Sequence, residues 1–198
     1  MTGRRTEILD GALAVLAAQG MRGLTHRAVD AAAGLAAGST SYYFRSRDAL
    51  VAGCVHRLLE RDLEQDVPEV EAALQEAGDP ARVLADVLAA VGVRMATTER
   101  TRTLARYELS LAAVRDPDLR AELVRGGDTI RRRGAALLGH AGAADPGAAA
   151  DEVAAVLDGL VYTALVRGPA DPGALAGWLR PVLHRVIAAL PGLASPPG

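Results

Sequence analysis

The chain of 198 residues contains one cysteine, no lysine and few aromatic residues. The lone cysteine, Cys54, excludes a disulfide bond within the chain and fits a reducing compartment. Aromatic residues make up 3% of the sequence but hydrophobic residues 50%, so a core must be built mainly from Ala, Leu and Val. This composition supports a packed core and favours closely packed helices over disorder.

The sequence also lacks a long hydrophobic run. No stretch approaches the roughly 18 uninterrupted apolar residues that a membrane span requires. Glu7 and Asp10 interrupt the apolar run near the N-terminus, which argues against a signal peptide. We therefore expect a cytoplasmic protein with no membrane partner.

Patterns of catalytic or metal-binding residues are missing as well. The sequence has no glycine-rich phosphate loop and no nucleophile elbow. Its histidines show no ligand spacing, and Cys54 and His56 fall on different faces of one predicted helix. We therefore expect no catalytic residue, no metal site and no cofactor, which leaves a binding protein or a helical scaffold protein.

Helical periodicity and helix-start signals run through the whole chain. An amphipathic helix is predicted from Ile8 to Gly20, and a long helix is predicted from Ser46 to Pro68. Four Asp-Pro pairs place an N-cap residue before a proline at the first helical position. The later helices are predicted at about 69–77, 80–99, 102–114, 117–140, 146–167 and 172–190. The fold is therefore predicted to be all-α, with about nine helices.

The stretch "THRAVDAAAGLAAGSTSYYFRSRDAL", residues 25–50, differs from the Ala- and Leu-rich sequence around it. Thr25 is a predicted N-cap of a short helix that stops at Gly34. A tight turn and a second short helix follow, and this second helix carries hydroxyl groups and two tyrosines. Two short helices joined by a turn with glycine describe a helix-turn-helix, in which the second helix enters the major groove of DNA. A helical corner with solvated hydroxyls is the alternative.

The charge distribution is compatible with such a module. The net charge of the chain is −2, but residues 1–50 contain six arginines and four acidic residues, a balance of +2. The rest of the chain therefore carries −4. A locally basic end on an acidic body fits one module that faces DNA.

The same stretch resembles the N-terminal DNA-binding domain of TetR-type transcriptional regulators over about residues 5–55. This resemblance implies three regions: a DNA-binding domain at 1–47, a helical ligand-binding and dimerisation domain at 48–190, and a flexible tail at 191–198. It also implies a ligand-responsive repressor that binds double-stranded DNA at a palindromic operator as a homodimer, with an unidentified small-molecule effector. The residues that it assigns to DNA binding are Thr25, Arg27, Ala37, Ser39, Ser41, Tyr42, Tyr43 and Arg47.

Three positions depart from the family pattern. Ser41 stands where such regulators usually carry a tyrosine, so we expect Tyr42 to take over that phosphate contact. Ala36 stands at a turn position that often holds a capping residue, which predicts a weakly capped second helix. Asp30 replaces a small apolar residue, and we expect a half-buried carboxylate there that needs an arginine partner.

The resemblance also implies that the C-terminal helices hold the dimer interface and the ligand pocket. Two helices near the C-terminus carry more apolar surface than one protomer needs. A face that serves only the protomer core is the alternative. The residues predicted for the dimer interface are Val153, Leu157, Leu160, Val161, Ala164, Leu179, Leu183 and Val186. The residues predicted for the ligand pocket are Leu104, Tyr107, Glu108, Leu111, Tyr162 and Trp178.

Overall fold

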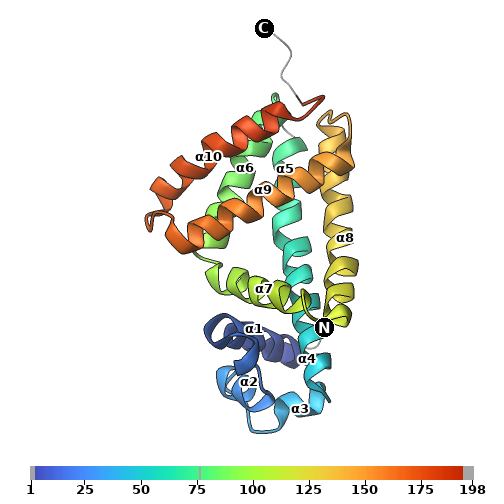
Figure 1. Ribbon diagram of the computed structural model, residues 1–198, viewed down its shortest axis with the longest axis vertical. Coiled ribbons are helices and arrows are strands. Elements are labelled where there is room, and N and C mark those ends of the chain that lie inside the picture. The colour runs from blue at the N-terminus through green and yellow to red at the C-terminus, as the bar shows by residue number, and fades with distance from the viewer. Residues whose placement is uncertain (1–2, 76, 194–198) are drawn as a thin grey trace. The chain divides into compact units, whose positions relative to one another are not determined.

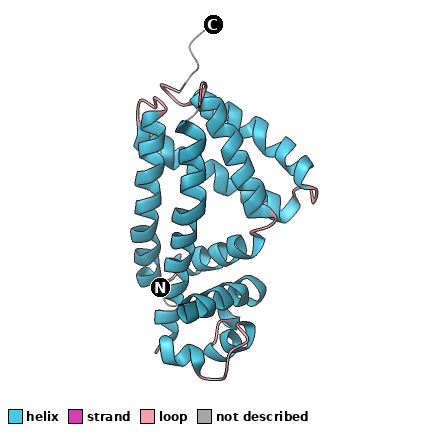
Figure 2. Cartoon of the chain, turned by 180° about the vertical axis from the view of Figure 1, so that it is seen from behind, coloured by secondary structure: helices cyan, strands magenta, loops and turns pink. Residues whose placement is uncertain are grey.

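The computed structural model describes residues 3–75 and 77–193. These residues form helices joined by short loops, and Figure 2 shows no strand among them. Helical structure runs without a break from Arg47 to Gln75, so the described residues form nine helices when this run counts as one. The elements are α1 (Gly3–Gly23), α2 (His26–Ala32), α3 (Ser39–Tyr43), α4 (Arg47–Arg61), η1 (Asp62–Asp66), α5 (Val67–Gln75), α6 (Pro80–Ala96), α7 (Arg100–Ala113), α8 (Pro117–His140), α9 (Pro146–Arg167) and α10 (Pro172–Ala189).

The four Asp-Pro pairs all start helices, as predicted. Each proline is the first residue of its helix, where its missing N–H would have no helical partner. The side chains of Asp79, Asp116, Asp145 and Asp171 accept hydrogen bonds from backbone N–H groups of the following first turn. Side-chain capping therefore sets the starts of α6, α8, α9 and α10.

The predicted helix boundary at Pro68 is wrong. The helix instead widens into the π-helical turn η1, and Pro68 follows as the second residue of α5. A proline lacks the N–H that would continue the regular i to i−4 ladder. A π-helical turn interrupts this ladder, so the chain passes the proline without leaving the helical state.

The chain divides into two compact units. The first comprises the residues up to Arg61 together with Thr101–Gly127, and the second comprises Asp62–Arg100 together with the residues from Asp128 onward. The first unit extends beyond residue 47 because α4 shares one core with α1. Leu50, Cys54 and Leu58 of α4 are buried in that core.

In the first unit, α1, α2 and α3 lie beside the N-terminal part of α4 (Figure 1). Helix α1 packs closely on its neighbours, since a Cβ on Gly11 would lie 2.9 Å from the Cβ of Ala33. The Arg57 guanidinium of α4 donates two hydrogen bonds to the Asp10 carboxylate of α1, at 2.8 and 3.2 Å. These contacts hold α1, α2 and α4 as one body.

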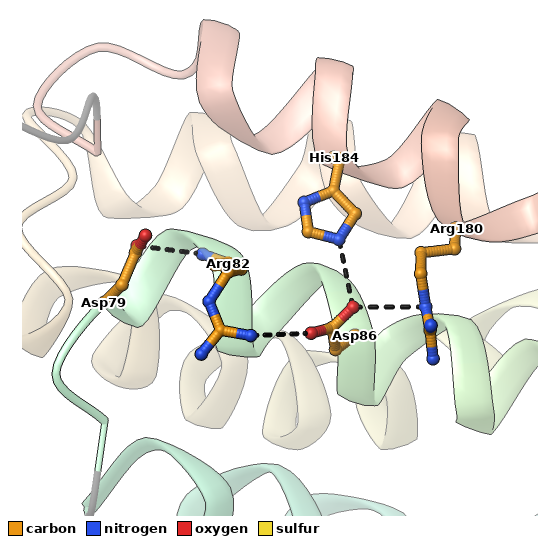
Figure 3. A network of polar contacts seen from close by, with 5 residues as sticks. All are labelled: Asp79, Arg82, Asp86, Arg180 and His184. Atoms are coloured by element: carbon orange, nitrogen blue, oxygen red, sulfur yellow. Dashed lines mark hydrogen bonds and ion pairs between the residues drawn. The ribbon is translucent and has the colours of Figure 1, made fainter.

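In the second unit, α6 packs against α5, α9 and α10. Gly92 of α6 allows this packing, because a Cβ there would lie 3.3 Å from methyl groups of both Leu157 and Leu179. A polar cluster joins α6 to α10 at the surface (Figure 3). The Asp86 carboxylate accepts hydrogen bonds from Nη1 of Arg82 at 3.3 Å and from Nε2 of His184 at 3.0 Å. It also forms an ion pair with Nε of Arg180 at 3.2 Å.

Several residues predicted for the dimer interface belong instead to the protomer core. Val161, Leu179 and Leu183 are fully buried, and Val153 is 8% exposed, so none of the four has a side chain available to a partner. They face inward because α6 covers that side of α9 and α10. The other four, Leu157, Leu160, Ala164 and Val186, are partly buried.

The predicted flexible tail, residues 191–198, is described only in part. Of the predicted flexible tail, residues 194–198 lie outside the described residues. Residues 191–193 form a turn in which Leu193 is buried and the carbonyl of Pro191 accepts from the N–H of Ala144 at 2.8 Å.

No helix within residues 3–75 and 77–193 is long and apolar enough to cross a membrane.

Candidate nucleic-acid interface

The site begins with two short helices in the predicted register. Thr25 is the N-cap of α2, and its hydroxyl accepts from the N–H of Ala28 at 3.1 Å. Gly34 follows the end of α2 with φ of 66° and reverses the chain, and Gly38 precedes α3 with φ of 93°. Both values lie in the left-handed region that glycine adopts without steric cost. The sequence therefore builds a helix-turn-helix with α3 as its second helix.

A side chain of α2 caps the N-terminus of α3. The carboxylate of Asp30 accepts from the backbone N–H of Gly38 at 2.8 Å and from that of Thr40 at 2.7 Å. It also accepts from the Thr40 hydroxyl at 2.6 Å. Because the first N–H groups of a helix have no partner within the helix, this carboxylate supplies the acceptors that α3 lacks.

This arrangement corrects two predictions. Asp30 is buried rather than half-buried, and hydroxyl and N–H groups satisfy it instead of an arginine. The N-cap of α3 is Gly38 rather than Ala36, and glycine has no side chain that could make a capping bond. Because the Asp30 carboxylate accepts from the N–H groups of Gly38 and Thr40 instead, α3 is not weakly capped. Burial raises the pKa of Asp30, while the hydrogen bonds from Thr40 and Gly38 and the nearby His26 together lower it by more, so that the net shift is downward.

The C-terminus of α3 is fixed by Phe44, the only phenylalanine of the chain. Its ring is buried in the core with Leu24 and Val29. The guanidinium carbon of Arg5 lies 4.4 Å from the ring centroid, a cation–π contact. Nε2 of His26 donates to the carbonyl of Phe44 at 2.8 Å. Both ends of α3 are therefore held by α1 and α2.

The outer face of the motif carries most of the side chains predicted to contact DNA. Tyr42 is 72% exposed, and its ring meets that of Tyr43 edge to face at 5.2 Å between centroids. Ser39 and Tyr43 are partly exposed. The exposed members of the predicted set are Thr25, Arg27, Ala37, Ser41, Tyr42 and Arg47. The structure thus brings the predicted set onto α2, α3, the turn between them and the start of α4.

Two of these side chains already have partners within the protein. The hydroxyl of Ser39 donates to the carbonyl of Ala36 at 2.7 Å, which leaves its oxygen as an acceptor. The guanidinium of Arg47 donates to the carbonyl of Met21 at 2.6 Å. Arg47 therefore links the start of α4 to the end of α1 through one of its five N–H donors.

A hollow of about 470 Å³ opens beside α3. It is lined by Arg4, Gly34, Leu35, Ala36, Ser39, Tyr42 and Tyr43. Nothing in the sequence connects Arg4 with this hollow, because the start of α1 is far from α3 along the chain. Helix periodicity likewise gives no signal for the capping role of Asp30 or for the burial of Thr40.

The residues predicted for a ligand pocket are divided between the two units. Leu104, Tyr107, Glu108 and Leu111 belong to the first unit, whereas Tyr162 and Trp178 belong to the second. Glu108 instead accepts from the N–H of Met21 at 3.2 Å, beside the break in α1 at Gly20. A second hollow, of about 400 Å³, lies in the second unit between α5 and α8, and other residues line it, including Glu71, Leu74, Arg133, Leu137 and His140.

The sequence matches two family models. The model described as bacterial regulatory proteins, tetR family, matches residues 8–54, which include the helix-turn-helix. The model described as tetracyclin repressor-like, C-terminal domain, matches residues 79–189. No curated protein matches the chain.

Solved structures of similar proteins cover nearly the whole chain. A member of the TetR family from Streptomyces coelicolor A3 is 32% identical, with 93% of this chain and 98% of the other covered and a TM-score of 0.68. The multidrug binding protein EbrR, complexed with imidazole, is 31% identical, with 98% and 94% covered and a TM-score of 0.66. A transcriptional regulator from Rhodococcus sp. Rha1 shares the fold at 17% identity, with 97% and 99% covered and a TM-score of 0.74.

Proposed function

Because the chain belongs to the TetR family of bacterial transcriptional regulators, we propose that it is a ligand-responsive repressor that binds a palindromic operator as a homodimer. One observation carries the proposal. The short helix α3 is fixed at both ends, by Asp30 and by Phe44, while its outer face presents hydroxyl and phenol groups to solvent. A rigid helix with short polar side chains suits the reading of base edges in a major groove.

We assign base and phosphate contacts to different residues of the motif. Ser39 is the first residue of α3, and Ala37 lies in the turn just before it. This is the end of the helix that meets base edges in helix-turn-helix complexes. Because the Ser39 proton is donated to Ala36, its oxygen is suited to accept from a base amine. Phosphates would be contacted by the exposed side chains around α3: Thr25, Arg27, Ser41, Tyr42, Tyr43 and Arg47.

The dimer would form through the outer faces of α9 and α10. On α9 the exposed residues Ala155, Gly159, Tyr162 and Val166 recur at helical spacing, and Tyr162 and Val166 are 58% and 64% exposed. On α10 the exposed residues Ala174, Gly177, Pro181 and Ala188 form a similar row. Small residues allow two helices to approach closely, and the neighbouring faces of α9 and α10 would form a four-helix interface between two copies.

This surface replaces the inward-facing part of the predicted interface. Added Cβ atoms on Gly159 and Gly177 would meet nothing within 4 Å, so both positions are open on the protomer. A symmetric dimer presents two identical α3 helices to DNA, and this symmetry is why we propose a palindromic operator.

We propose a small organic molecule as the effector. EbrR, which is 31–32% identical to this chain, is described as a multidrug binding protein and has been crystallised with imidazole, proflavin and ethidium. Leu104, Tyr107 and Leu111 of the first unit and, separately, Trp178 of the second unit remain our candidates for contacts to the effector, whereas Tyr162 is assigned to the dimer surface. Glu108 is not among them, since its carboxylate holds the N–H of Met21.

The experiment combines DNA binding with effector screening. We expect the purified protein to shift a duplex from the upstream region of its own gene, but not a scrambled duplex of the same length. A thermal-shift screen of metabolites and aromatic cations should then raise the melting temperature with some compounds, and these should release the duplex. Trp178 is the only tryptophan, so a change in fluorescence on adding a compound can be assigned to this one residue. Absence of any sequence-dependent shift would instead favour a helical scaffold protein.

A further inference from the structure

We propose that the hollow beside α3 binds a phosphate of the DNA backbone, and that Arg4 is the residue that holds it. This inference rests on the proposed DNA-binding function, but it adds a contact from α1, outside the helix-turn-helix itself. The hollow is lined by Arg4 of α1 and by Ser39, Tyr42 and Tyr43 of α3. The turn between α2 and α3 supplies the other lining residues.

The chemistry of the lining suits a phosphodiester. Arginine, serine and tyrosine side chains supply guanidinium and hydroxyl donors, and none of the residues that line the hollow carries a carboxylate. A guanidinium binds a phosphate through two parallel N–H donors, which makes the contact strong and directional. When α3 lies in a major groove, a sugar-phosphate backbone runs along each side of it. The hollow lies directly beside α3, where such a backbone would pass.

The turn between α2 and α3 leaves room for the sugar-phosphate backbone of DNA to approach the hollow. Gly34 lies in the turn with φ of 66°, and a Cβ added to it would meet nothing within 4 Å. Ala36 and Gly38 of the same turn are exposed and carry small side chains or none. A phosphate group can therefore come close to the turn without displacing a side chain.

Arg4 is held in the free protein by a contact that is easily exchanged. Its Nη1 lies 2.8 Å from Oε2 of Glu7, one turn later in α1, and the two side chains are 51% and 56% exposed. Exposed ion pairs of this kind contribute little to stability, because solvent screens them. Exchange of Glu7 for a phosphate therefore costs little.

The neighbouring arginine has a different role. Arg5 stacks on the ring of Phe44 at 4.4 Å and therefore belongs to the packing of the motif. Arg22, in the last turn of α1, is exposed and does not line the hollow. It offers a matched control, since its substitution removes the same charge from the same helix.

The test compares Arg4→Ala with Arg22→Ala in binding titrations over a range of salt concentrations. We expect Arg4→Ala to weaken binding about tenfold on operator and random DNA alike, the effect of roughly one charge-assisted hydrogen bond. The slope of log K against log salt should become shallower by about 0.9 for each phosphate that the variant no longer binds. Arg22→Ala should keep the wild-type slope, and both variants should keep the wild-type melting temperature.

Glu7→Gln supplies a second, independent readout. Release of Arg4 from Glu7 should tighten DNA binding two- to threefold in the wild-type background and have no effect in the Arg4→Ala background, a coupling measured by a double-mutant cycle. Equal tightening in both backgrounds would mean long-range charge repulsion only and would overturn the inference. So would a wild-type salt slope in Arg4→Ala while the wild type binds its operator. If the wild type bound no DNA at all, the proposed function itself would fail.

Discussion

The carboxylate of Asp30 in α2 accepts both the backbone N–H and the hydroxyl of Thr40 in α3, at 2.7 and 2.6 Å. Both residues are buried, at 4% and 0% exposure. The contact therefore joins the two helices of the motif away from water, where an unpaired carboxylate would be costly. It orients α3 without occupying any side chain of its outer face.

Asp30→Asn should destabilise the protein by about 1–3 kcal/mol, the cost of leaving buried donors unsatisfied. An asparagine presents a carbonyl oxygen to only part of the donor set, and its amide group would face N–H groups that also donate. The free energy of unfolding in urea measures the loss. Asp48→Asn, which changes an exposed carboxylate in the first turn of α4, should change it much less. Equal losses would mean that the cap is not what stabilises the motif.

The stability contributed by Asp30 should depend on pH in one direction. Its pKa is lowered in the folded protein, whereas an aspartate in an unfolded chain has a pKa of about 3.9. The contribution is therefore present above that unfolded value and is lost as the pH falls through the folded value. Urea unfolding of wild type and Asp30→Asn from pH 7 down to pH 3 should show the difference narrowing only below about pH 4. A difference that narrowed already between pH 7 and 5 would contradict the lowered pKa.

Ser39→Ala should reduce affinity for the operator by about 1 kcal/mol, the net value of one hydrogen bond, and have little effect on random DNA. Tyr42→Ala should reduce affinity for both DNAs by a similar factor, because its phenol is assigned to the backbone. Fluorescence anisotropy titrations at one fixed salt concentration compare the two. The assignment would be reversed if Ser39→Ala weakened both complexes equally and Tyr42→Ala only the specific one.

Gly159→Arg should convert the proposed dimer to monomers without unfolding the protomer. The position is open on the outer face of α9, so the side chain fits the protomer, but it would place an unpaired charge in the interface. Leu160→Arg is a less clean test, because Leu160 also packs against the core of the second unit. Sedimentation velocity at micromolar concentration measures the change.

Gly127→Arg, at another open helical glycine, is the matched control and should sediment as the wild type does. Circular dichroism should show the same helix content for both variants. A wild type that is itself monomeric at micromolar concentration would contradict the proposed dimer.

Asp86→Ala should destabilise the protein by about 1 kcal/mol, since the pair energies at this partly exposed site are small. The substitution leaves Arg82, Arg180 and His184 facing one another across α6 and α10 without the carboxylate between them. High salt should reduce the loss, because it screens repulsion between exposed charges. Asp151→Ala removes a carboxylate that is 60% exposed and 3.7 Å from Arg131, and it should cost less. A loss unchanged by salt would show that packing, not charge, is responsible.

Local signals in the sequence predicted the positions of most helices. An Asp-Pro pair fixes a helix start through a capping bond and a missing N–H, both within a few residues, and α8 and α9 span the predicted residues. Gly34 ends α2 for an equally local reason, its left-handed backbone. The helix-turn-helix and the family resemblance followed from the same short stretch. The rule that a proline ends a helix failed at Pro68, because the π-helical turn before it already interrupts the regular hydrogen-bond ladder.

The order of residues along the chain is enough to place the helix starts of this protein and the side chains of α3, since both depend on neighbours in sequence. Which faces those helices bury depends on tertiary packing. Leu179 and Leu183 belong to an apolar stripe that suits a core or an interface equally well, and the packing of α6 assigns them to the core. Asp30 finds its hydrogen-bond donors only because α3 packs against α2. Arg4 lies beside residues of α3 only in the folded protein, where both line one hollow. Contacts between residues distant in the chain follow from packing, for which helical periodicity carries no information.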